Sequence, residues 1–543
     1  MSKVAMYLQE HISGEVVTNA ALLGAMSRDG SVLEIAPEMV VYPRTTNDIR
    51  KVARFAWQLA EKGHMLPLTA RGSGTDQTGA AIGKGIILSL PAHMNAILEF
   101  DAKQKLVRVQ PGINAKALND ALLLHGVGIP SMPYSAAYST VGGAVANNAT
   151  GPLAGKYGDM SNWTHQLEVV LANGDILQTQ RLSKRDLNKK KGLQTFEGEI
   201  YRNLDNLIED NKQVIHEKLV SDIRDNVGYS SIAKVKQKDG SFDLTPLIVG
   251  SQGTLGMISE MIMKSDFMSG QSSVTVAAFT SKEAARDAID HLGGFEPAFL
   301  EYYDGECFTV AAAQGKHYGF AKGMETPVSA VLLIGFDDFN ERARHRKLKK
   351  VNKQLEKAGA VIESAEGEAA DELLAVREVT AYAAMPLAKD ASAPPLFDSV
   401  YVPRERFEEF SSALATLAAK HNVTLPLHGR VLDSVYSTRP TLQLHKVGDK
   451  QKIFKLLDEY SQLVDQYSGH LIAGGGEGRV KARFALAVFD DTVIQLFNGI
   501  KAIFDPYALL NPGVKQPLDI RQLVSHLRSD YDTASIPDHT PYN

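Results

Sequence analysis

Cysteine is almost absent from the sequence, since Cys307 is the only one in 543 residues. A single thiol cannot form an intrachain disulfide, a CxxC redox pair or a thiolate zinc site. The composition therefore favours a reducing compartment, and we expect the protein in the cytoplasm.

The chain also lacks a strongly basic field and any long uncharged apolar stretch. Its formal net charge is -5 at pH 7, with a pI near 6.3, which offers no electrostatic footprint for nucleic acid. The first 24 residues include Lys3, Glu10, His11 and Glu15, and they lack the apolar core of a secretory signal. No window approaches the length that a membrane span needs. We expect no nucleic-acid partner, no transmembrane segment, and at most a peripheral contact with a membrane.

What the sequence does contain is enough apolar residues, 44%, to build two or more packed units. The first part alternates strand and helix, with helices predicted at 48–63 and 115–124 and strands at 65–70, 85–90 and 106–110. Asn47 or Asp48 is the expected N-cap of the first helix. Asn173-Gly174, between two apolar runs, predicts a β-hairpin. An α/β or α+β fold is implied.

The later part changes character at about Val274. The polar segment 182–240 predicts helices and surface loop attached to the first domain. After it, a strand at 328–336 and a long charged helix at 338–358 indicate a second domain. The last stretch, 517–543, has little periodicity and is expected to be a wrapping or partly ordered tail.

Three segments are dense in glycine and other small residues: 71–79, 140–151 and 250–256. Backbone amides can approach a pyrophosphate only where side chains do not intervene, and glycine both removes the side chain and permits positive φ. Any one of these segments alone would be an ordinary turn. Their joint order is much more specific.

Further motifs occur in the same order around these loops. They are Tyr42-Pro43-Arg44-Thr45-Thr46-Asn47-Asp48-Ile49, Arg71-Gly72-Ser73-Gly74-Thr75, Gln110-Pro111-Gly112, residues 130–133, Thr140-Val141-Gly142-Gly143, Lys156-Tyr157-Gly158, Gly253-Thr254-Leu255-Gly256, Phe504-Asp505-Pro506 and Leu510-Asn511-Pro512-Gly513. Together they resemble the FAD-linked oxidoreductases of the vanillyl-alcohol oxidase type, with a PCMH-type FAD-binding domain. The similarity is to the branch that contains D-lactate dehydrogenases and the catalytic subunit of glycolate oxidase, and it covers roughly residues 35 to 515.

The resemblance implies an α+β fold, with an FAD-binding domain of two subdomains and a substrate-binding cap domain made of an antiparallel sheet and helices. It implies four segments: an N-terminal helical segment (1–36), the FAD-binding domain (37–270), the cap (271–480), and a C-terminal segment (481–543) that returns to the FAD-binding domain and ends in the tail.

The resemblance also implies that the glycine-rich loops hold FAD. The expected cofactor-binding residues are Arg71, Gly72, Ser73, Gly74, Thr75, Pro133, Thr140, Gly142, Gly143, Asn147, Gly151, Tyr157, Gly253, Gly256, Ile258 and Asn511. Relatives that attach the flavin covalently from the first loop carry a histidine there, whereas this loop reads Gly72-Ser73-Gly74-Thr75. Binding is therefore expected to be noncovalent.

On the substrate side, Arg377 lies in the segment Leu373-Leu374-Ala375-Val376-Arg377-Glu378, which resembles the place of a carboxylate-binding arginine. An arginine on the helix surface that pairs with Glu372 or Glu378 is equally consistent with the sequence.

Two motifs of the family's catalytic region are altered. Where relatives have two histidines around a Gly-Asp-Gly-Asn core, the segment 427–436 keeps only His428; where they have Gly-Glu-His-Gly, the segment 474–479 keeps Glu477 and has Gly478. His428 and Glu477 are candidate catalytic residues, and they are the only ligands for a doubtful divalent metal site that His445 or His470 would have to complete.

A second possibility is that His428 acts directly as the base, or that Tyr436 or another residue has taken that role. Arg430, Arg439 and Arg479, in or near the altered segments, could bind an acidic substrate or form surface ion pairs.

The expected activity is oxidation of a D-2-hydroxy acid such as lactate or glycolate, with hydride transfer to flavin N5. No segment has the G-x-G-x-x-G pattern of nicotinamide enzymes with its downstream acidic residue, so the expected electron acceptor is a quinone, a flavoprotein, an iron–sulfur protein or oxygen. Two alternatives stay open: an alcohol-type oxidase on the same scaffold, and a flavin-carrying electron-transfer subunit without its own substrate site.

Overall fold

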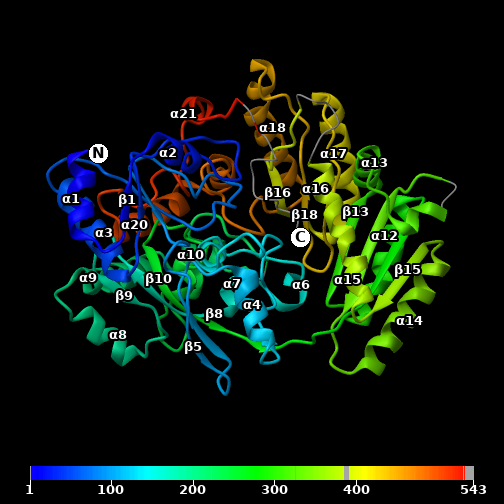
Figure 1. Ribbon diagram of the computed structural model, residues 1–543, viewed down its shortest axis with the longest axis horizontal. Helices are drawn as coiled ribbons and strands as arrows, with labels where there is room; N and C mark the ends of the chain where they lie inside the picture. The colour runs from blue at the N-terminus through cyan, green and yellow to red at the C-terminus, as the bar shows by residue number, and fades with distance from the viewer. Residues whose placement is uncertain (1, 222, 324–325, 385–390, 530, 532–543) are drawn as a thin grey trace.

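The computed structural model describes residues 2–221, 223–323, 326–384, 391–529 and 531. Along the long axis of the molecule, the N-terminal elements and α20 lie at one end, and a large antiparallel sheet with its helices lies at the other (Figure 1). The chain thus has the mixed helix-and-sheet, two-domain architecture that the sequence predicts.

The first subdomain is built on a four-stranded sheet of order β1-β2-β4-β3, in which β2, β4 and β3 are parallel and β1 is antiparallel. The strands are β1 (Glu15–Val17), β2 (Met39–Tyr42), β3 (Leu68–Arg71) and β4 (Ile86–Ser89), and the helices are α1 (Lys3–His11), α2 (Ala20–Met26) and α3 (Thr46–Ala60). Helix α3 buries an apolar face that includes Ile49, Val52 and Ala56. The parallel strands place the end of β3, and the loop that follows it, at one edge of the sheet.

The N-cap of α3 differs from the prediction. Thr45 caps the helix, with its side chain accepting a hydrogen bond from the Asp48 amide. The Asp48 carboxylate is not available for capping, because it accepts hydrogen bonds from the backbone amides of Ser13 and Arg44. It ties the N-terminal segment to the helix.

The second subdomain contains a five-stranded antiparallel sheet of order β5-β6-β10-β8-β9. Its strands are β5 (Ile97–Asp101), β6 (Leu106–Val109), β8 (Thr164–Val170), β9 (Ile176–Gln178) and β10 (Met257–Lys264); β7 (Val127–Gly128) pairs separately with β11 (Asp266–Phe267). Asn173-Gly174 forms the predicted turn between β8 and β9, with Gly174 at φ +84°. The helical elements are α4 (Ala115–Leu123), α5 (Val141–Ala146), α6 (Ala154–Tyr157), α7 (Met160–Trp163), α8 (Lys184–Lys191), α9 (Phe196–Asp210), α10 (Lys212–Lys218), η1 (Ser230–Lys234) and α11 (Thr245–Ile248).

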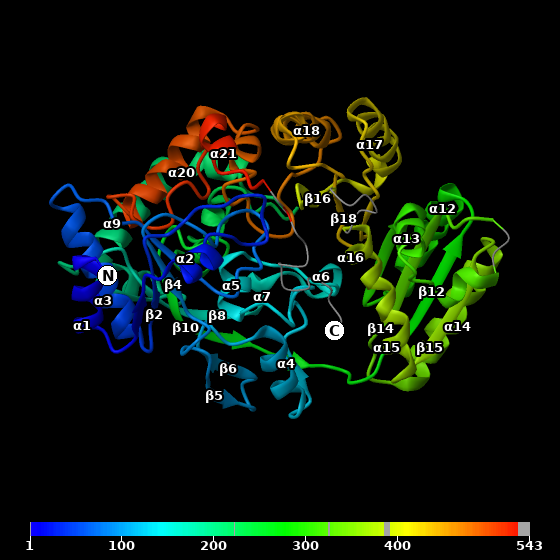
Figure 2. The same ribbon diagram turned by 45° about the horizontal axis from the view of Figure 1, so that its top comes forward.

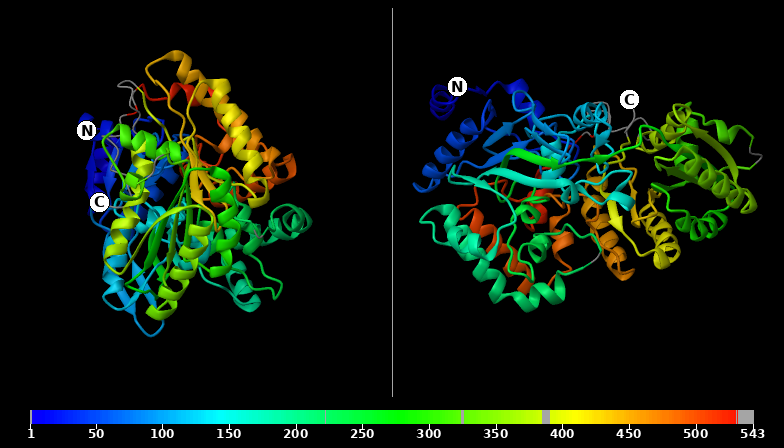
Figure 3. Two further views of the ribbon diagram at one scale, coloured as in Figure 1. Left: turned by 90° about the vertical axis from the view of Figure 1, so that its right-hand side faces the viewer. Right: turned by 90° about the horizontal axis from the view of Figure 1, so that it is seen from below.

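The cap is a seven-stranded antiparallel sheet of order β15-β12-β14-β13-β17-β18-β16, seen at the right of Figure 2 and, from below, at the right of Figure 3. Its strands are β12 (Ser273–Phe279), β13 (Phe299–Asp304), β14 (Ala330–Phe336), β15 (Val361–Glu366), β16 (Phe397–Tyr401), β17 (His428–Arg430) and β18 (Val435–Thr438). Its helical elements are α12 (Lys282–Leu292), η2 (Gly293–Phe295), α13 (Gly305–Ala313), η3 (Gly319–Gly323), α14 (Glu341–Lys357), α15 (Ala369–Leu374), η4 (Ala375–Glu378), α16 (Val379–Ala383), η5 (Arg404–Arg406), α17 (Phe407–His421) and α18 (Val447–Gln466).

The C-terminal segment crosses back from the cap to the first subdomain through α19 (Ala482–Leu486), α20 (Asp491–Phe504) and α21 (Ile520–Ser525). Leu68 in β3 donates its amide to Leu509 and accepts one from Asn511, which adds a short parallel partner to the sheet edge. Further on, Leu527 bridges to Leu33. The wrapping or partly ordered tail expected at 517–543 stays a prediction, because residues 530 and 532–543 lie outside the described part of the chain.

Within the described ranges, no helix has the length and apolar character that crossing a bilayer requires.

Candidate active site

A cavity of about 340 Å³ lies where the two FAD-side subdomains and the cap meet, within the size range of cofactor and substrate sites. On one side it is lined by the loop after β3, by the start of α5 and by residues 251–258. On the other side it is lined by residues of the cap strands β13, β16, β17 and β18. The three glycine-rich loops that are far apart in the sequence therefore form one wall.

The loop after β3 presents unpaired backbone donors to this cavity. The amides of residues 72–75 donate to no other residue that the structure describes, and all four residues line the cavity. Gly74 has φ +81°, and a Cβ there would meet the Arg71 guanidinium at 2.2 Å. A row of free N–H groups with no intervening side chain fits an anionic pyrophosphate.

The two adjacent glycines of the second loop, Gly142 and Gly143, are required for different reasons. Thr140 caps α5, and its side chain accepts from the Gly143 amide at 3.2 Å. A Cβ on Gly142 would meet Pro111 backbone and side-chain atoms at 2.5 to 2.9 Å, so this glycine is required by packing. A Cβ on Gly143 would meet only the Thr140 hydroxyl, at 3.1 Å, and otherwise point into open space. Gly143 is therefore the glycine that keeps the cavity clear.

Most of the predicted cofactor residues line the cavity, but Gly151, Tyr157 and Asn511 do not. A Cβ on Gly151 would collide with the Met132 carbonyl at 1.8 Å, so it serves close packing. The Tyr157 hydroxyl donates to Asp337 at 2.5 Å, across to the cap. Asn511 is buried and bonds to backbone carbonyls of Ala80 and Gln252, which fixes the C-terminal segment behind the loops.

On the cap side, Glu301 in β13 holds several polar side chains together. Its carboxylate accepts hydrogen bonds from Tyr303 at 2.5 Å and from Tyr134 at 3.3 Å. Arg377 Nε lies 3.0 and 2.9 Å from its two oxygens, and Arg377 Nη2 lies 2.9 Å from Oε1. Arg377 is thus a cavity-lining residue, as a substrate-binding arginine should be, yet it is buried and paired with Glu301 rather than with Glu372 or Glu378.

His428 opens β17 and lies on the cavity wall, stacked 6.4 Å from the ring of Tyr303. Its Nδ1 is buried and has no hydrogen-bond partner among the described residues. Burial, together with the positive charge of Arg439, lowers the pKa of His428 to about 4, against an opposing effect of Asp398. The imidazole is therefore neutral at physiological pH and able to accept a proton.

Glu477, predicted to accompany His428, is not brought to the cavity. Its carboxylate is fully buried, 2.6 Å from Lys515 Nζ and 2.7 Å from the amide of Gly228. This ion pair joins the end of the segment 271–480 to the C-terminal segment, which gives Glu477 a structural role. No group of three or more metal-ligating side chains occurs within the described ranges.

Of the other side chains proposed for the altered motifs, some lie away from the cavity and others line it. Tyr436 is buried against Phe407, His470 lies 3.4 Å from Asp225 in a separate cavity, and His445 is exposed. Arg479 is buried among backbone carbonyls behind the first loop, and burial lowers its pKa to about 10. The cavity lining includes Arg430 and Arg439.

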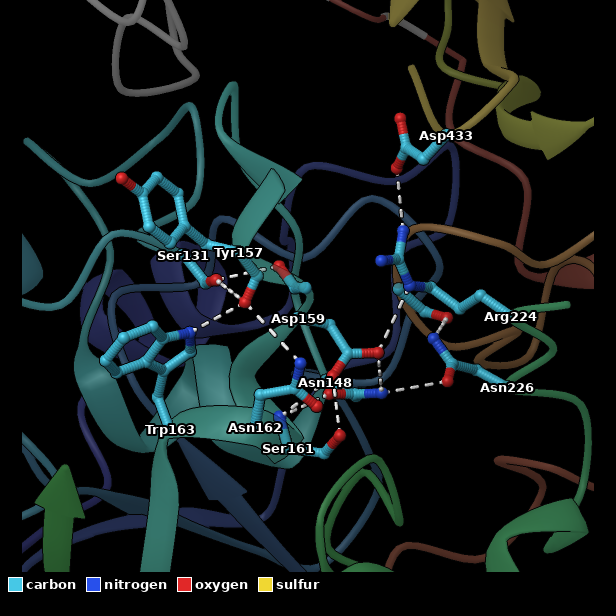
Figure 4. Close-up of polar contacts among 12 residues, drawn as sticks. Ser131, Asn148, Tyr157, Asp159, Ser161, Asn162, Trp163, Arg224, Asn226 and Asp433 are labelled. Carbon is cyan, nitrogen blue, oxygen red and sulfur yellow. Dashed lines mark hydrogen bonds and ion pairs between the residues drawn. The ribbon is translucent and has the colours of Figure 1, made fainter. Parts of the chain in front are cut away.

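A polar network shown in Figure 4 connects the FAD-side loops to the cap. Arg224 donates to Asp159 at 3.1 Å and to Asp433 at 2.8 Å. Asn148, at φ +46°, also donates to Asp159 at 3.1 Å. Asp433 in turn holds Arg430, so the orientation of a cavity-lining arginine depends on residues of both domains.

Comparisons with known proteins agree with this architecture. Residues 37–180 match an FAD binding domain, and residues 270–514 match the C-terminal domain of FAD linked oxidases. The D-2-hydroxyglutarate dehydrogenase of Haemophilus influenzae is 26% identical over 96% of this chain and 53% of its own length, so the chain spans about half of that relative. Glycolate oxidase subunit GlcD of Bacillus subtilis is 27% identical over 90% of this chain and 91% of its own length. The structure of 4-ethylphenol oxidase from Gulosibacter chungangensis has a TM-score of 0.68 at 16% identity, covering 96% of this chain and 99% of that one.

The fold and the cavity define an FAD-linked oxidoreductase with a cap. The chain thus contains an FAD binding domain and the C-terminal domain of FAD linked oxidases, is similar at 25 to 27% identity to D-2-hydroxyglutarate dehydrogenase, D-lactate dehydrogenase and GlcD relatives, and shares the fold of 4-ethylphenol oxidase.

Several lining residues were not predicted, and Glu301 is the most informative of them. A signal for it was present: a carboxylate stands inside the aromatic run Phe299-Leu300-Glu301-Tyr302-Tyr303, whose residues are all buried. A charged residue within a buried strand indicates a paired or functional group. Gln252 and Gly476, also in the lining, lie in glycine-rich segments that the sequence did point to.

Proposed function

We propose that this protein is an FAD-dependent dehydrogenase that oxidises a D-2-hydroxy acid of the lactate or glycolate kind and passes the electrons to an acceptor other than a nicotinamide. The observation that supports it is one continuous cavity with two different ends. Free amides and glycines form the end suited to a pyrophosphate, and a neutral histidine with three arginines forms the end suited to a hydroxy acid.

The residues at one end of the cavity would bind FAD, and those at the other end would bind the substrate. The backbone amides of residues 72–75 and the start of α5 would hold FAD, which supplies a hydride acceptor at N5 when bound. An arginine of the cap binds the carboxylate of the acid, and Arg377, which lines the cavity, is the one that the family resemblance favours. His428 takes the hydroxyl proton; because its Nδ1 is buried, Nε2 is the atom that receives it.

Noncovalent attachment of FAD is part of this proposal. The first loop presents Ser73 between two glycines, and Cys307 is buried in the cap, away from the cavity. We expect acid precipitation of the purified yellow protein to leave all of the flavin in the supernatant as FAD, measured by absorbance and chromatography. Flavin that sediments with the polypeptide would contradict this.

The activity itself is tested by anaerobic reduction. Loss of flavin absorbance is followed in a stopped-flow instrument with a panel of D- and L-2-hydroxy acids and, in parallel, simple alcohols and NADH. We expect reduction by D-2-hydroxy acids only. Reduction by alcohols alone would indicate an alcohol-type oxidase, and reduction by none of the small molecules would indicate an electron-transfer subunit.

A further inference from the structure

The charges at the cap end of the cavity are matched in pairs. Arg377 is bound by two nitrogens to Glu301, within a site where both side chains are almost completely buried. Arg430 is bound by Nε and Nη2 to Asp433, at 3.0 and 2.8 Å. Each of these guanidinium groups thus has an acidic partner already.

The third carboxylate of this end, Asp398, pairs with Lys481. The remaining charged residue is Arg439, which follows directly after β18 and lines the cavity half-buried. It forms no hydrogen bond or ion pair with any residue in the described part of the chain. The cap end therefore carries one uncompensated positive charge.

That charge acts on the group that would remove the substrate proton. Arg439 contributes to the low pKa of His428, so its guanidinium lies within electrostatic range of the imidazole. A partly desolvated cation with no acidic partner is unfavourable until an anion binds beside it. A carboxylate bound by Arg439 would therefore lie near His428.

We propose that Arg439 binds the carboxylate of the substrate, and that the substrate is a 2-hydroxy acid with a single carboxylate. The proposal rests on the dehydrogenase function proposed above and moves the carboxylate contact from Arg377 to Arg439. If Arg377 were to bind the substrate with its paired nitrogens, Glu301 would remain buried without its cation. Arg377 instead positions Glu301 and the two tyrosines bound to it.

The limit to one carboxylate follows from the same count of paired and unpaired charges at the cap end of the cavity. One uncompensated arginine matches one negative charge, whereas a second carboxylate would enter a site in which Arg377 and Arg430 are already paired. A buried anion without a partner is strongly disfavoured. The site should therefore discriminate against dicarboxylic acids.

Binding to the FAD-loaded enzyme tests the carboxylate contact directly. Pyruvate and its neutral analogue pyruvamide are titrated by calorimetry into wild type, Arg439→Gln, Arg439→Lys and Arg342→Gln. Arg342 lies exposed on α14 and makes the same change of net charge away from the cavity. We expect Arg439→Gln to weaken pyruvate binding by about tenfold to a hundredfold without changing pyruvamide binding. The affinity of Arg439→Lys for pyruvate should lie between those of wild type and Arg439→Gln. The affinity of Arg342→Gln should equal that of wild type.

Equal pyruvate binding by wild type and Arg439→Gln would overturn the assignment of Arg439. This outcome differs from failure of the proposed function, in which no 2-hydroxy acid reduces the wild-type flavin, and which would remove both proposals.

The proposal that the substrate has a single carboxylate is tested by measuring kcat/KM for D-2-hydroxypentanoate and for D-2-hydroxyglutarate, two acids with the same number of carbons. A higher kcat/KM for the dicarboxylic acid would overturn the single-carboxylate proposal, and a higher value for the monocarboxylic acid supports it.

Discussion

Replacement of Gly143 by valine is expected to give folded but colourless protein. The valine Cβ meets only the Thr140 hydroxyl on the protein side, so the remaining side-chain atoms must enter the cavity in front of the free amides. Because those amides can approach a pyrophosphate only when nothing stands before them, we expect FAD binding to weaken by at least about tenfold. The flavin content per polypeptide measures the loss of FAD binding. The thermal unfolding temperature of the apoprotein shows whether the variant is still folded.

Gly142 provides the matched control for this substitution. A side chain there collides with Pro111 at 2.5 to 2.9 Å, so Gly142→Val should lower stability as well as flavin content. Gly143→Val that retains the wild-type flavin content would show that the start of α5 does not face the pyrophosphate. It would also remove the main support for the division of the cavity into two ends.

The parts of the site that the sequence predicts are those that a short segment determines by itself. The loop at residues 71–79 was singled out by its glycines and by its order among the other motifs, and the structure places residues 72–75 on the cavity wall, whereas their contact with FAD stays a prediction. Asn173-Gly174 likewise determines its own turn. His428 was identified because one histidine of a family motif survives at the start of a strand, and the structure places it on the cavity wall.

The parts that could not be predicted depend on residues far apart in the sequence. Glu301 and Arg377 are separated by 76 positions, and they meet only in the folded cap, where Glu301 lies in the central strand β13 and Arg377 in η4. Glu477 shows the converse. Its motif suggested chemistry, but its side chain points to Lys515, 38 positions away, in a segment that returns from the cap. A motif gives the place of a residue in the chain, whereas the direction of its side chain is set by tertiary packing.

His428→Asn should slow flavin reduction by about a hundredfold or more while leaving substrate affinity nearly unchanged. A positioned base contributes about 10² to 10⁴ to the rate, and asparagine keeps a polar side chain of similar reach but cannot accept the proton. The limiting rate of anaerobic reduction and its dependence on acid concentration separate these two quantities. Unchanged reduction kinetics would exclude His428 as the base, and activity that a chelator abolishes and a divalent ion restores would instead favour a metal at this residue.

The pH dependence of the wild-type enzyme gives a second, independent check on His428. Protonated imidazole cannot act as a base, so kcat/KM should fall as the pH decreases through the pKa of His428 in the free enzyme. Burial and the charge of Arg439 bring that pKa to about 4, compared with an ordinary value near 6.5. We therefore expect kcat/KM to stay level from about pH 7.5 down to about pH 5 and to decline only below that. A decline centred between pH 6 and pH 7 would show that the base is a histidine in an ordinary aqueous environment, which does not describe His428 on the wall of this cavity.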